Sequence, residues 1–171
     1  ISLSGLSDLG DAVGTFNSAV TGGQSVVRIH SNAQVDTVAS NGQAAPGAGG
    51  ATFFSSSTLS IANDDRITFL GSLSAGGFGI YQQSGATLQP IALGGQSALL
   101  VGGGTFNLGL NVSTRALDNG STFFTAGISG GTANYAQYLG TPGNLATLMS
   151  TADALPADAR RFSTYRMRRA S

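Results

Sequence analysis

The stretch NDDRITFLGSLSAGGFGIYQQSGATLQPIALGG, from Asn63 to Gly95, alternates apolar and polar residues and is interrupted by glycine pairs. A period of two is typical of a half-buried strand, with successive side chains turned alternately toward the core and toward solvent. Across residues 66–73 one set is Ile67, Phe69, Gly71 and Leu73, and the other is Arg66, Thr68, Leu70 and Ser72. Further strands are expected at 78–83 and 87–93, joined by a turn at Ser84-Gly85. The stretch therefore predicts an antiparallel β-meander.

The same pattern occurs three times along the chain. Three matching segments end in glycine pairs that recur every 54 residues: DAVGTFNSAVTGG (Asp11 to Gly23), DRITFLGSLSAGG (Asp65 to Gly77) and NGSTFFTAGISGG (Asn119 to Gly131). A second marker, GGATFF at 49–54, returns as GGGTFN at 102–107, and RRFSTY at 160–165 lies where a third is expected. Self-similarity at a fixed period is typical of repeat proteins. The glycine pairs suit tight turns with positive φ, since no helix pattern follows them to form a phosphate site.

We expect an all-β fold of three tandem four-stranded antiparallel repeats, which resemble β-propeller blades or form an open stack. The repeats of about 54 residues are expected at approximately 3–57, 58–112 and 113–159, forming one domain over 1–159, followed by an Arg-rich tail at 160–171. Propellers usually have at least four blades. Three units would leave strand edges open, and open edges pair with other chains. Self-association is therefore expected.

The charged residues are few and unusual in kind. Only 9% of the chain is charged, the eight basic residues are all Arg, and the eight acidic residues are all Asp. Soluble domains typically have about 25% charged residues, so this small, polar surface favours an extracellular or assembling protein. The chain has no cysteine, so disulfides do not stabilise it. No apolar run approaches the length of a membrane-spanning helix.

One of the repeats resembles a known repeat family. LSIANDDRITFLGSLSAGGFGIY, from Leu59 to Tyr81, is similar to the tandem repeats of secreted bacterial choice-of-anchor proteins. In those repeats a turn of the type L-N-x-x-G leads into V-A-F-x-A-x-L and then G-G-x-G-I-F. Residues 6–29 and 115–138 match more loosely. The resemblance implies a propeller-like β architecture and export to the cell surface or beyond, and it brings no catalytic residues.

The sequence gives little support to an enzyme. His30 is the only histidine, and without Cys, Glu or a nearby acidic cluster it cannot form a metal site. We interpret it as an ordinary residue at a strand end. Glu is absent, the Asp residues lie mostly in polar turns, and the nucleophile elbow G-x-S-x-G is missing. We therefore assign no catalytic and no cofactor-binding residues.

The acidic turns are the best candidates for a ligand site. Asn63 to Asp65, Asp8 with Asp11, and Asp118 occupy matching turns of the repeats. Calcium prefers six to eight oxygen ligands from several spacings, more than two carboxylates per turn supply. Turn-forming Asx residues are thus the favoured interpretation. Calcium at Asp11, Asp64, Asp65 and Asp118 is the alternative.

The C-terminal tail interleaves arginines with large side chains. Its candidate assembly residues are Arg160, Arg161, Phe162, Tyr165, Arg166, Arg168 and Arg169. Such a pattern can bind nucleic acid, but we favour a clasp in which the arginines contact the acidic turns of a neighbouring unit, and we expect no nucleic-acid partner. N-glycosylation would be open to Asn111 and Asn119 only in a glycosylating pathway.

We therefore expect a non-catalytic structural repeat module, extracellular or at the cell surface, that self-associates into a filament, layer or matrix. The partner would be a homo-oligomer or polymer, formed through strand edges and the tail. The alternative is a cell-surface module that binds carbohydrate or calcium through Asp and Asn turns.

Overall fold

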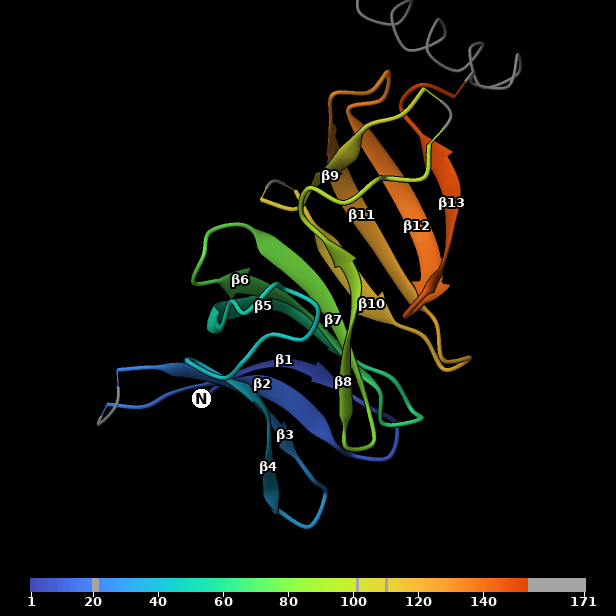
Figure 1. Cartoon of the computed structure of the whole chain (residues 1–171). Coiled ribbons are helices and arrows are strands. Elements are labelled where there is room, and N and C mark those ends of the chain that lie inside the picture. Colours follow the sequence, from blue (N-terminus) through green and yellow to red (C-terminus); the bar gives the residue numbers. More distant parts are fainter. Residues whose placement is uncertain (20–21, 101, 110, 154–171) are drawn as a thin grey trace, which may run out of the picture.

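The fold is all-β in a computed structural model that describes residues 1–19, 22–100, 102–109 and 111–153. Three antiparallel sheets follow one another along these residues, and none of the sheets closes into a barrel (Figure 1). The expected fold class is confirmed. The part of the chain described contains no helix long and apolar enough to span a membrane.

Sheets 1 and 2 are four-stranded meanders in which each strand pairs with the next along the chain. The strands of sheet 1 are β1 (Ser2–Leu6), β2 (Ala12–Asn17), β3 (Gln24–Ile29) and β4 (Val35–Ser40). Those of sheet 2 are β5 (Phe53–Ile61), β6 (Ile67–Leu73), β7 (Phe78–Ser84) and β8 (Thr87–Leu93). The strands predicted at 67–73 and 87–93 are therefore β6 and β8, and β7 extends one residue beyond the predicted 78–83.

Sheet 3 repeats this meander with a divided first strand. Its strands are β9 (Thr105–Asn107), β10 (Ser113–Ala116), β11 (Thr122–Ser129), β12 (Tyr135–Thr141) and β13 (Asn144–Ser150). Both β9 and β10 pair with β11, so together they take the place that β5 has in sheet 2. The second sequence marker thus begins a sheet, and the repeat boundaries placed near residues 58 and 113 fall within or beside first strands.

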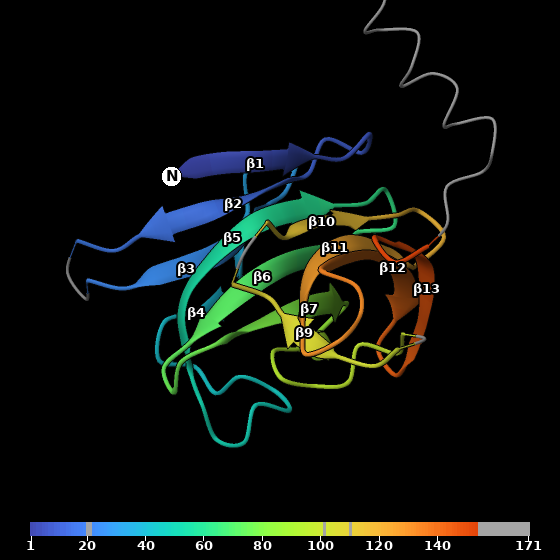
Figure 2. The ribbon, with the colours of Figure 1, turned by 90° about the horizontal axis from the view of Figure 1, so that it is seen from above.

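The three sheets stack in chain order with sheet 2 in the middle. A first hydrophobic cluster joins sheets 1 and 2, and a second joins sheets 2 and 3. The first strands lie together, since β5 contacts both β1 and β10 (Figure 2). We call the side of a sheet that is turned toward the next sheet along the chain its forward face, and the opposite side its backward face.

Aromatic side chains fill equivalent places on the backward faces of sheets 2 and 3. Two triads recur there: Phe53, Phe69 and Tyr81, then Phe106, Phe124 and Tyr138. Edge-on and stacked rings with centroids about 5 Å apart are favourable beyond their buried area. In sheet 1 the places of Phe69 and Tyr81 are taken by Gly14 and Val27, as the strand registers show. The backward face of sheet 1 therefore has no such triad among its described residues.

Sheet 2 is more buried than its alternating sequence suggests. Thr68 and Leu70, predicted for the solvent side of β6, are 0% and 8% exposed. Sheet 3 covers this side, and its cluster with sheet 2 includes Leu70 and Ile80. A half-buried strand was the wrong expectation for β6, because the neighbouring repeat buries its second face.

Candidate functional site

The first hairpin turn of each sheet has the same backbone hydrogen bonds. In sheet 1 the N–H groups of Ser7 and Gly10 donate to the carbonyls of Asp11 and Ser7. The corresponding donors are Ala62 and Asp65 in sheet 2, and Leu117 and Gly120 in sheet 3. Gly10, Asp65 and Gly120 all have positive φ, a conformation that Asp tolerates better than most residues. These turns make Asp8, Asn63 and Asp118 equivalent residues.

Asp8, Asn63 and Asp118 are joined in a hydrogen-bonded series, which we call the Asx ladder. The Asp8 N–H donates to Oδ1 of Asn63 at 2.7 Å, and the Asn63 N–H donates to Oδ1 of Asp118 at 2.9 Å. The Asn63 side-chain amide donates to Oδ2 of Asp8 at 2.8 Å and to Oδ2 of Asp118 at 3.1 Å. A single asparagine amide thus separates two carboxylates and links all three sheets.

A second contact also links each sheet to the turn of the next one. Arg28, on the forward face of sheet 1, lies 2.6 Å from an oxygen of Asp65 in the following turn. Gln82 holds the equivalent place in sheet 2, and its amide donates to the Gly120 carbonyl at 3.1 Å. Arg28 and Gln82 therefore each link their own sheet to the first hairpin turn of the next sheet.

Arg28 also organises the acidic groups of sheet 1. It donates to Oδ2 of Asp11 through Nε at 2.9 Å and through Nη2 at 2.5 Å. The hydrogen bond from Arg28, then that from the Ser31 N–H, lowers the pKa of Asp11 below its ordinary value. His30, directly after β3, lies between Asp11 and Asp36, with ring nitrogens 3.2 Å and 2.8 Å from their carboxylates. Its hydrogen bond lowers the pKa of Asp36.

The four carboxylates proposed for calcium all have protein partners. Asp11 and Asp65 contact Arg28, Asp64 lies 3.3 Å from Arg66, and Asp118 accepts hydrogen bonds from Asn63. Among the described residues no group of three or more His, Cys, Asp or Glu is placed to hold a metal ion. Calcium binding at these turns stays a prediction.

The forward face of sheet 3 includes positions that are buried in the other two sheets. The strand registers make Met149 of β13 equivalent to Ala39 of β4 and Ala92 of β8. Each pairs with the corresponding residue of the strand before it, which is Gln137, Val26 or Ile80. Ala39 and Ala92 are each 1% exposed, whereas Met149 is 48% exposed. The residues of this face are Phe123, Thr125, Tyr135, Gln137, Leu139 and Met149. Among the described residues, no further sheet covers this face.

The backward face of sheet 1 shows the same difference. The strand registers make Leu6 equivalent to Ile61 and Ala116. Each lies in the first strand of its sheet and pairs with the first residue of the next strand, which is Ala12, Ile67 or Thr122. Leu6 is 73% exposed, whereas Ile61 and Ala116 are 8% and 6% exposed. The exposed large apolar residues of this face are Leu3, Leu6, Phe16 and Val35, and they surround the partly buried Ile29 and the buried Val27. Both ends of the stack therefore carry apolar faces of the kind that its interior buries.

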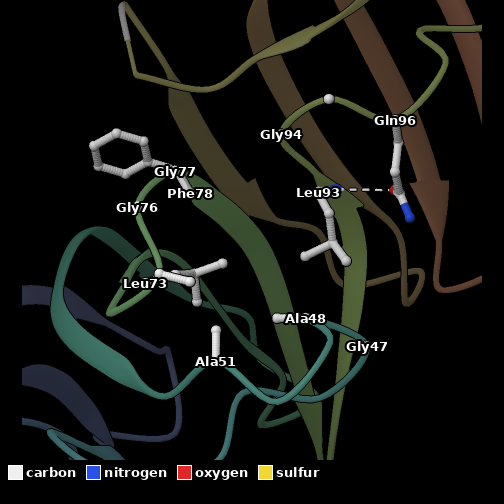
Figure 3. A pocket seen from close by; sticks show the side chains of 12 residues that line it. Gly47, Ala48, Ala51, Leu73, Gly76, Gly77, Phe78, Leu93, Gly94 and Gln96 are labelled. Carbon is white, nitrogen blue, oxygen red and sulfur yellow. Dashed lines mark hydrogen bonds between the residues drawn. The ribbon is translucent and has the colours of Figure 1, made fainter.

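One hollow among the described residues includes the Asx ladder, and another lies apart from it. A groove of about 530 Å³ runs along the three first strands and includes the Asx ladder, with Ser60, Thr114 and Arg115. A second, of about 450 Å³, lies between the 47–51 loop, the β6–β7 turn and the end of β8 (Figure 3). Glycines and apolar side chains such as Leu73, Phe78 and Leu93 dominate its lining. It offers no charged group among its described lining residues.

The remaining candidate residues are placed as follows. The tail residues Arg160 to Arg169 lie outside the described residues, so their role as a clasp stays a prediction. Of the two glycosylation candidates, Asn111 donates its side-chain amide to the Tyr135 hydroxyl at 3.0 Å, and Asn119 accepts from the Ser121 N–H at 3.0 Å. Asn111 therefore has a structural contact of its own.

Comparison with known proteins places the chain in a family. Residues 11–170 match the family described as Family of unknown function (DUF7453), and the chain belongs to this family. The match begins at the first hairpin of sheet 1 and includes nearly all of the tail. Neither the curated proteins nor the solved structures give a significant match to the chain.

Sequence reasoning missed the Asx ladder and the Arg28–Asp65 link. The ladder residues are 55 positions apart, one more than the glycine-pair spacing, so they do not coincide in an alignment built on the glycines. An alignment of the turns alone would have identified Asp8, Asn63 and Asp118. No local signal connects Arg28 with a residue of the next repeat.

Proposed function

We propose that the chain is a non-catalytic structural module whose sheets associate face to face with further sheets of the same kind. One observation carries the proposal: positions that are buried between sheets inside the stack are exposed at both of its ends. Leu6 and Met149 are the clearest cases. Unpartnered apolar faces of this kind mark interaction sites. The two end faces differ, so association through them is head to tail and produces open chains or closed rings.

The end faces offer enough apolar surface for a specific contact. Full burial of one large apolar side chain contributes about 1.5–3 kcal/mol. Leu3, Leu6 and Val35 on one face are more than half exposed, and Tyr135 and Met149 on the other are more than a third exposed. Burial of several such side chains exceeds the lower estimates of the entropy lost on association.

The surroundings in which such a module works are also part of the proposal. We assign it to a filament, layer or matrix outside the cell or at its surface. The support comes from the absence of Lys and Glu, from the low charge, and from the similarity of residues 59–81 to secreted choice-of-anchor repeats. The arginines of the tail would add contacts to the acidic turns of a neighbouring unit.

The mass of the purified chain, measured over a hundredfold range of concentration by light scattering, tests the proposal. We expect oligomers that grow with concentration, and rings or filaments in negative-stain images. Met149→Lys places a charge on the forward face of sheet 3 and is expected to abolish the growth. Ser84→Lys, at the exposed last residue of β7, is the matched control. A chain that stays monomeric at all concentrations contradicts the proposal.

The groove along the first strands favours a second function, the binding of carbohydrate or calcium at a cell surface. It gathers the side chains of Asp8, Asn63, Arg115 and Asp118 in one hollow, and such groups hydrogen-bond sugar hydroxyls or coordinate calcium. This function predicts saturable thermal stabilisation by a glycan or by calcium chloride. An unchanged melting temperature across a broad glycan panel and with calcium would count against it.

A further inference from the structure

The Asx ladder ends with unused hydrogen-bonding groups. Within the ladder each backbone N–H donates to Oδ1 of the next residue, from Asp8 to Asn63 and from Asn63 to Asp118. The N–H of Asp118 has no acceptor among the described residues. At the other end, Oδ1 of Asp8 accepts from no described donor. Both ends lie at the edges of the two unpartnered sheet faces, so a docked sheet would extend the ladder.

The ladder also sets a chemical condition on the next residue. Asn63 supplies the only side-chain donor, and its amide hydrogens satisfy one carboxylate on either side. Ionised carboxylates only accept hydrogen bonds, so two of them side by side leave both without a donor and repel each other. A carboxylate in the series therefore requires an amide as its neighbour.

We infer that the forward end of the stack recognises a sheet of this repeat type whose first hairpin turn carries asparagine at the ladder position. This inference rests on the proposed function and names the partner that the forward face prefers. The inference extends the pattern of the two interfaces inside the stack. At each of them a backbone N–H donates to Oδ1 of the next ladder residue, and an amide donates to a carboxylate. Such an asparagine accepts from the Asp118 N–H through Oδ1 and donates from its amide to Oδ2 of Asp118.

A second copy of the chain satisfies this condition only in part. Head-to-tail docking of two copies keeps the hydrogen bond from the Asp118 N–H to Oδ1 of Asp8. It also places the two carboxylates next to each other without an amide. The apolar faces still match, but the ladder opposes the contact. The Asx ladder is thus a specificity device, and the apolar faces supply the attraction.

A variant with the opposite alternation tests this inference. The changes Asp8→Asn, Asn63→Asp and Asp118→Asn exchange amide and carboxylate along the ladder. The two side-chain hydrogen bonds inside the chain are then kept with their direction reversed, and the two backbone N–H groups still donate to Oδ1 of the next residue. A stack of this variant and the unaltered chain alternates carboxylate and amide at every junction. The unaltered chain alone does not.

The experiment measures association by sedimentation velocity at pH 7, for the unaltered chain alone and for its equimolar mixture with the inverted variant. We expect the mixture to associate about tenfold or more tightly, because it gains a hydrogen bond to a charged group and loses a repulsion. Asp64→Asn changes the net charge by the same amount outside the ladder, since Asp64 pairs with Arg66. Its mixture is expected to behave like the unaltered chain.

Equal association of all three samples overturns the inference and leaves the proposed function standing. An equal gain in association with the Asp64→Asn control also overturns the inference, because net charge alone would then explain the tighter association. If no sample associates at any concentration, the proposed function fails together with the inference. Circular dichroism of each variant shows beforehand that the sheets are intact.

Discussion

Tyr138→Phe is expected to destabilise the protein, whereas Tyr81→Phe is expected to be neutral or stabilising. The two tyrosines hold equivalent places in the aromatic triads, and both are fully buried. The Tyr138 hydroxyl donates to the Ala98 carbonyl at 2.7 Å. The Tyr81 hydroxyl has no partner among the described residues. The pair is therefore a matched test of what a buried hydroxyl contributes.

The magnitudes follow from the two environments. Removal of the Tyr138 hydroxyl leaves the carbonyl of the buried Ala98 unpaired, and such a group costs about 1–3 kcal/mol. Removal of the Tyr81 hydroxyl relieves an unpaired buried polar group, which stabilises by up to about 1–3 kcal/mol. For a small protein with a urea m-value of about 1–3 kcal/mol/M, the Tyr138→Phe midpoint should fall by about 1 M, while the Tyr81→Phe midpoint is unchanged or rises.

Urea unfolding at pH 7, followed by circular dichroism, measures both variants. An equal loss of stability from the two changes would mean that the hydrogen bond to Ala98 contributes nothing, contrary to this prediction. An alkaline titration adds a second check. Burial raises the pKa of Tyr81 and of Tyr138 to about 12. The contribution of the neutral tyrosines to the free energy of unfolding is therefore full below about pH 10 and is lost between about pH 10 and 12. Each phenylalanine variant should lose less stability in that range.

Three further results are expected. The lowered pKa of Asp11 means that its pairing with Arg28 stabilises the fold fully at pH values above the ordinary carboxyl pKa of 3.8. This stabilisation is lost as the pH falls through the lowered pKa. The free energy of unfolding of Asp11→Asn should therefore depend less steeply on pH in acid than that of the unaltered chain. Gly71→Ala places a Cβ 2.8 Å from the ring of Phe53 and should cost about 1–3 kcal/mol in urea unfolding, whereas an unchanged midpoint would show that the ring moves freely. Deletion of residues 160–171 should reduce oligomer mass in light scattering, and an unchanged mass would exclude the proposed clasp.

Local patterns predicted the strands of sheet 2 well. The period of two in residues 67–73 and the turn at Ser84-Gly85 depend only on neighbours in the sequence, and β6, β7 and β8 lie where those signals place them. The repeat itself could also be found, because turns that need glycine keep their spacing. Gly22, Gly76 and Gly130 all have the positive φ that this explanation requires.

Contacts between repeats could not be predicted in the same way. Thr68 and Gln82 look like solvent-facing residues in the sequence, yet both are buried because sheet 3 covers them. Gln82 satisfies its amide on Gly120 and Thr122, some 38 and 40 residues away. A strand pattern gives the two faces of a strand, but not which of them another repeat covers.

The division of the chain into repeats shows a related limit. The sequence marker around Phe53 was assigned to the end of a unit, whereas β5 is the first strand of sheet 2. A meander of similar strands reads equally well from several starting points, and only the pairing of β5 with β6 decides between them.

Cross-linking between two tagged copies shows whether the open sheet faces contact each other. Gly5, Ser60 and Arg115 hold equivalent places in the three sheets, and so do Leu6, Ile61 and Ala116. Inside the stack, Gly5 lies against Ile61, and the Ala116 N–H donates to the Ser60 hydroxyl. The equivalent contact between two copies is therefore Arg115 of one copy against Leu6 of the other. The chain has no cysteine of its own. Single Arg115→Cys and Leu6→Cys chains, treated together with a short bis-maleimide, should therefore give a mixed dimer.

The control for geometry is a Ser60→Cys, Ala116→Cys chain, which should cross-link within itself. The control for random contact replaces Leu6→Cys by Ser84→Cys in the mixture. We expect a mixed dimer between Arg115→Cys and Leu6→Cys that clearly exceeds the Ser84→Cys background. A yield at that background, while the internal control cross-links fully, would contradict the claim that the open sheet faces are the surfaces through which this module associates.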